Sequence, residues 1–384
     1  MGLASLKDLR VLVVNPGSST LKLGLLGRGG PLEAERVLAT RDGAFEEGGL
    51  DAFVGSAGQV DAAGHRVVHG GSRFTGPALI DDGVVAYLET LVELAPLHQG
   101  AALAAIAGLR RLLPGIPHVA CFDTAFHARM PAAASTYAIP AAWRERFGVR
   151  RFGFHGLSHA YAARRAAQLL REPAGRLRVV TCHLGSGASL AAVRGGRSVD
   201  TTMGFTPLEG LVMATRSGSV DPGLLLWLQQ RRGLPAAEVL DSLEHGSGLR
   251  GLAGSADMRQ VLSAATAGDP ASVLALDVYV HRLRAAIAAM AAALGGLDAL
   301  VFTGGVGENA PEVRARAASG LRFLGVSVDG RRNRAARGDA DVSRRGAAAR
   351  TLVVRAREDL EIVRQVWRLL GGRGRGDTKG GAHS

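Results

Sequence analysis

Three short polar loops, spread over nearly three hundred residues, each follow an apolar run of the kind that forms a β-strand. They are NPGSST at residues 15–20 after LRVLVV, HLGSGAS at 183–189 after RVVTC, and GGVGEN at 304–309 after ALVFT. Each loop offers glycine or hydroxyl residues where the backbone can approach phosphate oxygens and donate N–H groups to them. A single glycine-rich turn is common, but three in the same strand-loop setting predict one polyphosphate held between two parts of the chain.

The order of the expected elements supports two related α/β lobes around a cleft. Residues 11–26 are typical of a strand, a turn and a second strand, and the pattern returns at 178–193. Apolar periodicity and flanking residues predict the remaining elements. We expect further strands at 64–71, 118–122, 299–303 and 351–354, and helices at 82–94, 100–113, 223–230, 272–294, 311 onward and 358–370.

Composition excludes several classes of protein. At 384 residues, with 47% hydrophobic and 21% charged residues, the chain fits two domains of ordinary size and is not disordered. The longest apolar stretch, at 285–297, is too short to cross a bilayer. No signal-peptide pattern opens the sequence, and the two cysteines, Cys121 and Cys182, fit buried thiols in a reducing cytoplasm.

The net charge of +12 raises the alternative of nucleic-acid binding. However, the arginines are scattered, aromatic residues make up only 5%, and no nucleic-acid-binding motif is present. Only three lysines occur, Lys7, Lys22 and Lys379, against 43 arginines, so Lys22 just after the first loop is notable. A compact ammonium there suits a phosphate, although chance placement is the alternative.

Several residues have the chemistry for phosphoryl transfer, which needs charge neutralisation and positioning. Arg66 in GHRVVHGG and Arg216 in MATRSGSVDPG have glycine and small polar neighbours, which favours a cleft, while a surface position is the alternative. Asp123 ends a strand and is either functional or a cap. FHGLSH at 154–159 carries two histidines four apart; a zinc site lacks its usual glutamate or cysteine partners. Hydrogen bonding to developing charge fits His155 better, and a core position is the alternative for His159.

Long motifs in this sequence resemble the acetate kinase family of acetate and propionate kinases. They occur in family order from about residue 11 to 365 and read VLVVNPGSSTLKLGLL, GHRVVHGGSRFTG, LAPLHQGAALAAI, FDTAFHARMP, RFGFHGLSHAY, CHLGSGASLAAV, SVDTTMGFTPLEGLVMATRSGSVDPG, FTGGVGENAPEVR and REDLEIVR. The resemblance implies two duplicated lobes of the actin/Hsp70/sugar kinase ATPase type with nucleotide in the interlobe cleft. It also implies a cytoplasmic homodimer that binds neither membrane nor nucleic acid. We expect an N-terminal lobe of residues 1–125 plus 360–384 and a nucleotide-binding, dimer-forming lobe of residues 126–359.

The implied activity is reversible, Mg²⁺-dependent phosphoryl transfer from ATP to acetate, giving acetyl phosphate and ADP, with Mn²⁺ as an alternative metal. A propionate kinase and a catalytically weak nucleotide-binding relative are the alternatives. By position in the motifs, Asn15 and Glu358 would hold the metal. Asp123 would be the acid/base residue, and His155 and Arg216 would stabilise the transition state. Arg66 would bind the carboxylate, beside an apolar pocket of Val68, Leu97, Phe154 and Pro207. ATP would contact Lys22, His183, Leu184, Gly185, Ser186, Gly187, Asp257, Met258, Arg259, Gly305, Val306, Gly307, Glu308 and Asn309.

Two points depart from that pattern. Acetate is already an anion and needs no base, so we hypothesise that Asp123 instead orients Arg66 or Arg216 or supports the metal. Ser186 stands where the family has asparagine, Met258 where it has phenylalanine, and Ser219 where it has an acidic residue. These changes bear on nucleotide affinity more than on the class of reaction.

Overall fold

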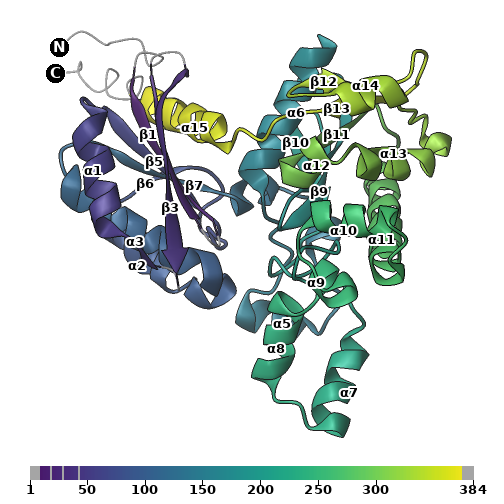
Figure 1. Ribbon diagram of the computed structural model, residues 1–384. Helices are drawn as coiled ribbons and strands as arrows, with labels where there is room; N and C mark the ends of the chain where they lie inside the picture. Colours follow the sequence, from purple (N-terminus) through teal and green to yellow (C-terminus); the bar gives the residue numbers. More distant parts are fainter. Residues whose placement is uncertain (1–8, 18–19, 28–29, 42–43, 374–384) are drawn as a thin grey trace. The chain divides into compact units, whose positions relative to one another are not determined.

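The computed structural model describes residues 9–17, 20–27, 30–41 and 44–373. The chain divides into two compact units, Met1–Ala128 with Arg357–Ser384, and Arg129–Ala356. Figure 1 shows their helices and strands. In the described residues no helix is both long and apolar enough to cross a membrane.

The first unit is built on a seven-stranded sheet in the order β4-β3-β2-β1-β5-β7-β6. β1 pairs antiparallel with β2 and parallel with β5, and β5 pairs parallel with β7. Its strands are β1 (Val11–Pro16), β2 (Thr20–Leu26), β3 (Leu32–Arg41), β4 (Ala44–Phe45), β5 (Ala62–Val67), β6 (Ala78–Leu79) and β7 (His118–Phe122). Its helices are α1 (Glu47–Ala57), α2 (Asp82–Glu89), α3 (Pro96–Leu112) and α15 (Glu358–Arg373), with 3₁₀ turns at Val92–Leu94 and Thr124–His127.

The second unit repeats this topology in a six-stranded sheet, β10-β9-β8-β11-β13-β12. β8 pairs antiparallel with β9 and parallel with β11, and β11 pairs parallel with β13. Its strands are β8 (Arg178–Leu184), β9 (Ala188–Arg194), β10 (Arg197–Thr201), β11 (Ala299–Thr303), β12 (Ala340–Asp341) and β13 (Arg350–Val353). Both sheets also end in a short antiparallel strand that precedes its neighbour in the chain, which confirms the expected duplication.

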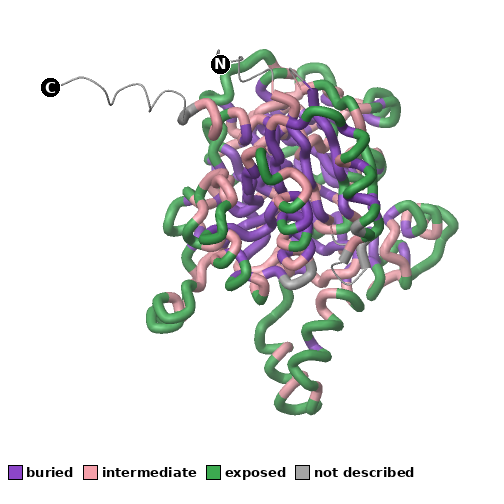
Figure 2. The backbone as a smooth tube through the Cα atoms, turned by 90° about the vertical axis from the view of Figure 1, so that its left-hand side faces the viewer, coloured by how far each residue is buried: buried purple, intermediate pink, exposed green. Residues whose placement is uncertain are grey.

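The helices of the second unit are α4 (Ala132–Ser135), α5 (Ala141–Phe147), α6 (Gly156–Leu170), α7 (Pro222–Arg232), α8 (Ala236–His245), α9 (Gly248–Ala253), α10 (Met258–Thr266), α11 (Pro270–Leu294), α12 (Gly304–Asn309), α13 (Pro311–Ser319) and α14 (Gly330–Ala335). Further 3₁₀ turns lie at Ala174–Arg176 and Arg322–Leu324. Figure 2 shows how buried residues follow the sheets while exposed residues dominate the outer helices.

One helix on each sheet is preceded in the chain by strands of the other unit. α6 comes after β7 but packs on β8, β9 and β11, and α15 comes after β13 but packs on β1, β5 and β7 (Figure 1). The contact between α15 and β5 is close at Gly64, where an added Cβ would lie 2.5 Å from Ile362 Cγ2 and 2.9 Å from Val366 Cγ2. A glycine is therefore needed there to seat α15 and, with it, Glu358.

The expected strands 118–122 and 299–303 have these same bounds in the structure. The helix expected at 82–94 is shorter, because α2 ends at Glu89 and a 3₁₀ turn follows. The third glycine-rich segment, expected to be a loop, is helix α12. Gly304 adopts φ +79° and starts this helix against the backbone of Leu184, whose carbonyl oxygen would lie 2.8 Å from an added Cβ. Both cysteines are buried and free, as expected.

Candidate functional site

Four polar side chains that the sequence marks as functional candidates meet in the first unit. Asn15 lies near the end of β1, Arg66 near the end of β5, Asp123 directly after β7, and Glu358 at the start of α15. Because β1, β5 and β7 are parallel neighbours, their carboxyl ends meet at one edge of the sheet, which is where ligands bind in open α/β sheets. The topology therefore assembles residues that are far apart in sequence.

Arg66 is the centre of this cluster. Its Nε and Nη2 donate to Asp123 Oδ2 at 3.1 and 2.7 Å, and its Nη1 donates to Asn15 Oδ1 at 3.0 Å. Asn15 Nδ2 in turn donates to Glu358 Oε2 at 2.8 Å, and that oxygen lies 3.6 Å from Arg66 Nη1. All the groups that fix the guanidinium are thus on rigid elements, which leaves little freedom in its direction.

The charges of this cluster balance one another. The Asp123 side chain is 1% exposed and the Arg66 side chain 13%, so neither would be stable there without a partner. Burial by itself lowers the pKa of Arg66, but the carboxylates of Asp123 and Glu358 outweigh it and hold that pKa above its ordinary value. Arg66 therefore stays cationic, and it has the geometry to bind a further carboxylate.

Lys22 lies on β2 opposite Asn15 in the antiparallel register. Directly opposite residues of an antiparallel pair project from the same face of the sheet. Lys22 is exposed, and its ammonium is thus on the face that carries Asn15. The two serines of the first loop, Ser18 and Ser19, lie outside the described residues.

His155 is the centre of a second cluster, in the second unit. It caps α6 with a left-handed backbone, φ 54° and ψ 26°, which is strained for a residue with a side chain. Its ring stacks on His183, with centroids 4.2 Å apart, and its Nδ1 lies 2.9 Å from Ser189 Oγ. Strain of this kind persists only where surrounding contacts impose it, and here it presents the ring to the second loop.

Arg216 converges on the same loop. A Cβ added to Gly187 would lie 2.9 Å from Arg216 Nη2 and 3.3 Å from His155 Nε2. Arg216 Nη1 donates to Pro207 O at 2.8 Å, and burial lowers the pKa of Arg216, with Glu244 partly offsetting this. Within the described part of this unit no carboxylate forms an ion pair with Arg216, so its charge is available to an anion.

The second and third glycine-rich segments lie side by side. Thr303 pairs with His183 at the ends of β11 and β8, and Gly304 packs on Leu184. Ser186 is exposed, and its carbonyl accepts from Ala214 N. The structure therefore brings together these members of the expected nucleotide set: His183, Leu184, Gly185, Ser186, Gly187, Gly305, Val306, Gly307, Glu308 and Asn309.

The side chains of Glu308 and Asn309 stabilise helix α12. Glu308 Oε1 accepts from the backbone N–H groups of Gly304 and Ala356, at 3.0 and 2.9 Å. Asn309 Nδ2 donates to Gly305 O at 2.9 Å. These hydrogen bonds hold α12 in shape, and through them each side chain contacts backbone groups of the protein itself.

Among the described residues, no hydrogen bond joins the segment 257–259 to the segments 183–187 and 304–309. Asp257 caps α10 by accepting from Arg259 N, and it also pairs with the Arg259 guanidinium at 2.6 Å. Met258 is buried and packs in the core, so the substitution of phenylalanine by methionine changes packing more than polarity.

The expected apolar pocket residues belong to different units. Val68 lies in the first unit and is buried, while Phe154 and Pro207 belong to the second. Phe154 is also buried and directly precedes His155. The side chain of Leu97 lies outside the described residues.

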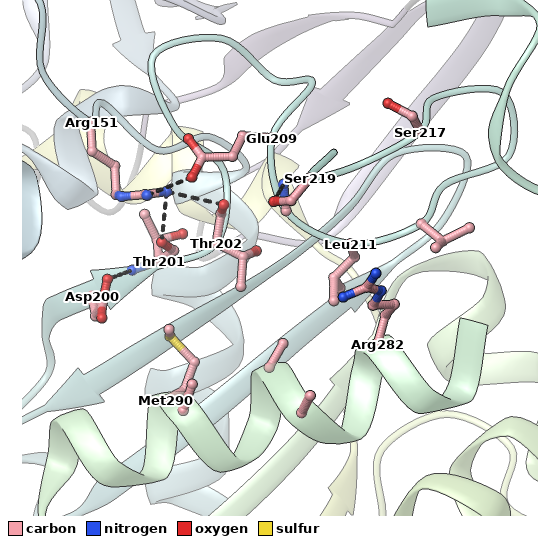
Figure 3. Close-up of a pocket in the computed structure, with 15 residues that line it drawn as sticks. Arg151, Asp200, Thr201, Thr202, Glu209, Leu211, Ser217, Ser219, Arg282 and Met290 are labelled. Carbon is pink, nitrogen blue, oxygen red and sulfur yellow. Dashed lines mark hydrogen bonds and ion pairs between the residues drawn. The ribbon is translucent and has the colours of Figure 1, made fainter. Parts of the chain in front are cut away.

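A pocket of about 360 Å³ is lined in part by Glu209, Leu211 and Ser217, from the loop region between β10 and α7 (Figure 3). On its wall Arg151 donates to Glu209 Oε1 at 2.6 Å and to the carbonyls of Thr202 and Met203 at 3.1 Å. Burial and the Glu209 carboxylate raise the pKa of Tyr137, whose hydroxyl therefore stays protonated and donates to Glu209. Glu209 thus holds the loop next to Pro207. The sequence motifs contain both Arg151 and Glu209, but nothing in their spacing indicated this contact.

The side-chain oxygens of Asn15 and Glu358 are the candidate Mg²⁺ ligands. No group of three His, Cys, Asp or Glu side chains arranged for a metal occurs in the described residues. Mg²⁺, however, usually takes one or two carboxylates and fills its shell with water and phosphate oxygens. One carboxylate and one amide oxygen, adjacent at the sheet edge, fit that use of the metal and do not fit an all-protein cage.

Comparisons with known proteins agree with this geometry. The sequence profile of the acetokinase family matches residues 45–364. The chain belongs to the acetokinase family. It is 47% identical to the acetate kinase of Synechococcus sp. (strain JA-2-3B'a(2-13)), over 95% of this chain and 100% of that one. It is also 47% identical to the acetate kinase of Leifsonia xyli subsp. xyli (strain CTCB07), over 92% and 97%.

Solved structures of this family share the fold. Porphyromonas gingivalis acetate kinase superposes with a TM-score of 0.86 at 35% identity, covering 94% of this chain and 100% of that one. A propionate kinase from Francisella tularensis gives 0.85 at 33% identity, covering 93% and 98%. The actin/Hsp70-type fold expected from the sequence is confirmed. The chain is a phosphotransferase, and family membership implies use of ATP and ADP.

Proposed function

We propose that this member of the acetokinase family catalyses the reversible, Mg²⁺-dependent transfer of the γ-phosphoryl group of ATP to acetate. The observation that carries the proposal is the convergence of Arg216 and His155 on Gly187, with no ion-pair partner recorded for Arg216 in the described part of that unit. Phosphoryl transfer depends on such groups, because charge accumulates on the oxygens of the transferred group. The two relatives that are 47% identical to this chain are acetate kinases, whereas the propionate kinase named above is 33% identical, which favours acetate over propionate.

Arg66 is the proposed acetate ligand. Its guanidinium is held by Asp123 and Asn15, and a guanidinium can bind a carboxylate through two parallel hydrogen bonds. Val68, Leu97, Phe154 and Pro207 are the proposed contacts of the methyl group. Discrimination against one extra methylene in such a pocket amounts to about 1–3 kcal/mol, so propionate is expected as a poorer substrate.

The chemical step requires no proton transfer from acetate. A carboxylate oxygen of acetate forms a bond to the γ-phosphorus, and the bond from that phosphorus to the β,γ-bridging oxygen breaks, leaving its electron pair on ADP. Arg216 and His155 would stabilise the charge on the transferred group. Asp123 would position Arg66, which fits its nearly complete burial against that guanidinium better than a role as a base.

The proposed nucleotide contacts in the second unit are His183–Gly187 and Gly305–Asn309, two segments that lie next to each other, together with Asp257–Arg259. In the first unit the proposed contact is Lys22. Asn15 and Glu358 would hold Mg²⁺, which when bound neutralises phosphate charge. Mn²⁺ is expected to substitute, because it shares the preference for oxygen ligands.

A hydroxamate assay tests this proposal directly. Purified protein is given ATP, Mg²⁺ and either acetate or propionate, with hydroxylamine to trap the acyl phosphate. We expect rapid product from acetate, less from propionate, and none when EDTA removes the metal. A preparation that makes no acyl phosphate from acetate, although correctly folded, would rule the activity out.

We also propose that the chain forms a homodimer in the cytoplasm. Two buried free thiols support a reducing compartment. The support for a dimer is α7, which has no buried residue although Leu224, Leu226 and Trp227 lie on it, each more than two-fifths exposed. We expect light scattering to give twice the 39.8 kDa chain mass, and Leu226→Asp to give the monomer mass. A monomeric unmodified chain at micromolar concentration would contradict the dimer.

A further inference from the structure

A chain of buried polar side chains lies behind His155. Ser189 Oγ is 2.9 Å from His155 Nδ1 and 2.8 Å from His159 Nε2, and His159 Nδ1 is 2.8 Å from Thr181 Oγ1. Ser189, His159 and Thr181 come from β9, α6 and β8, and each is fully buried. Hydrogen bonds in such a setting are strong and their directions interdependent.

The single hydrogen of the Ser189 hydroxyl limits how this chain can be arranged. It can be donated to His155 or to His159, but not to both. The other ring must therefore donate an N–H group to Ser189 Oγ. Either His155 carries a proton on Nδ1 or His159 carries one on Nε2.

Thr181 decides between these two arrangements. Its Oγ1 lies 3.4 Å from Ala191 O, and a carbonyl oxygen can only accept. If Thr181 donates there, His159 Nδ1 must donate to Thr181, and neutral His159 then accepts the Ser189 hydrogen at Nε2. His155 Nδ1 is left to donate to Ser189 Oγ.

We infer that Thr181, His159 and Ser189 are positioning residues that fix the proton of neutral His155 on Nδ1, so that its Nε2, at the edge facing Gly187, donates a hydrogen bond only in the imidazolium form. This inference rests on the proposed function of His155 at the transferred phosphoryl group. A ring proton must then be gained before His155 can stabilise that group as a donor.

The surroundings of His155 make this proton uptake dependent on ligand. Arg216, His183 from β8 and His159 from α6 are titratable groups that lie close to the ring. Arg216 opposes a second positive charge nearby, whereas a bound polyphosphate favours it. We therefore expect nucleotide to promote protonation of His155.

Nuclear magnetic resonance of the whole protein, with ¹⁵N-labelled histidine, tests the tautomer without any measurement of activity. Two-bond ¹H–¹⁵N correlations distinguish Nδ1–H from Nε2–H, and the loss of one signal set in His155→Asn assigns the ring. We expect Nδ1–H for His155 at neutral pH without ligand. Finding Nε2–H would overturn the inference, whatever the enzyme does.

Thr181→Val supplies the matched perturbation, since it removes the hydroxyl and preserves the shape of the side chain. Without the acceptor for Nδ1–H, His159 is expected to carry its proton on Nε2. Ser189 then donates to His155, whose proton moves to Nε2. Thr181→Ser keeps the hydroxyl and should keep the wild-type pattern. An unchanged His155 tautomer in folded Thr181→Val would contradict the chain, and if that variant does not fold, the wild-type tautomer still decides.

Kinetics give a second readout. Ser189→Ala should lower kcat about tenfold, the scale of one lost hydrogen bond, with little change in KM for acetate, and should shift the pH dependence of kcat. Ser189→Thr should restore both, because it restores the hydroxyl. If Ser189→Ala kept the wild-type kcat and pH profile, a positioning role would be excluded. Absence of acetate-dependent turnover in the wild type would instead refute the proposed function and leave the tautomer result standing.

Discussion

The guanidinium of Arg66 places two nitrogens, Nε and Nη2, on one oxygen of Asp123, at 3.1 and 2.7 Å. An arginine held in this way cannot rotate, and its Nη1 is fixed as well by Asn15 at 3.0 Å. The Asp123 side chain is nearly fully buried where it forms this ion pair. Asp123 and Asn15 thus fix the orientation of the Arg66 guanidinium, and a guanidinium of fixed orientation is suited to bind a small carboxylate.

Replacement of Asp123 by asparagine should therefore impair acetate binding. We expect Asp123→Asn to lower kcat/KM for acetate about tenfold to a hundredfold, mainly through KM, because a hydrogen bond to a charged group contributes about 1.5–3 kcal/mol. Steady-state kinetics over a range of acetate concentrations measures this. Asp82→Asn, which removes the exposed partner of Arg110, is the matched control and should change nothing. A loss of kcat alone, with KM unchanged, would favour an acid/base role instead.

Arg216 should contribute chiefly to the chemical step. We expect Arg216→Ala to reduce kcat about a thousandfold while the protein stays folded, as for arginines that stabilise phosphoryl transfer elsewhere. Arg216→Lys should recover little, because an ammonium cannot reproduce the planar fork. Arg250→Ala, at an exposed arginine of α9, is the control. Near-normal kcat in Arg216→Ala would remove this residue from the mechanism.

The substitution Gly187→Ala should lower kcat while leaving the melting temperature nearly unchanged. The added Cβ would meet Arg216 Nη2 at 2.9 Å and His155 Cε1 at 3.2 Å. Arg216 Nη2 is the end of a flexible side chain and can move, so the melting temperature should change little. The displaced guanidinium should nevertheless lower kcat by more than tenfold. Gly175→Ala, where an added Cβ meets nothing within 4 Å, should match the wild type in both measurements. Full activity of Gly187→Ala would show that this convergence is not functional.

A buried histidine pair should make the first unit sensitive to acid. His65 Nε2 lies 3.0 Å from His118 Nδ1, and His118 Nε2 donates to Leu113 O, so both contacts are made when the two rings are neutral. His65 Nδ1 is buried without a hydrogen-bond partner among the described residues, so a proton added there would have no acceptor from them. Burial, and to a lesser degree His118, lowers the pKa of His65 from 6.5 to about 3. The unfolded chain therefore takes up a proton at a higher pH than the folded one. The contribution of neutral His65 to the free energy of unfolding is therefore complete above pH 6.5 and declines as the pH falls towards 3.

Urea unfolding at several pH values measures this effect. The free energy of unfolding should fall by about 1.4 kcal/mol per pH unit below 6.5 on account of His65. His65→Gln should flatten that slope, whereas His245→Gln, at an exposed histidine of α8, should not. Identical slopes in wild type and His65→Gln would contradict the prediction.

The sequence by itself determined the family, the class of reaction and most of the regular structure. Long motifs such as FTGGVGENAPEVR are specific because several residue types must coincide at fixed spacing, and strands such as His118–Phe122 follow from local apolar patterning. Local patterning also explains the miss at α12, because glycines typical of a loop are accommodated in a helix once Leu184 supports the turn at Gly304.

Only the tertiary structure decided which partners the functional side chains have. Asn15 and Glu358 are 343 residues apart and meet because α15 packs on β1 and β5. Likewise, His159 could be a core residue or a functional one from its sequence alone, and its contacts with Thr181 and Ser189 come from three separate elements. Hydrogen-bond direction and ion-pair geometry depend on ångström-scale placement, which long-range packing sets and local sequence does not encode.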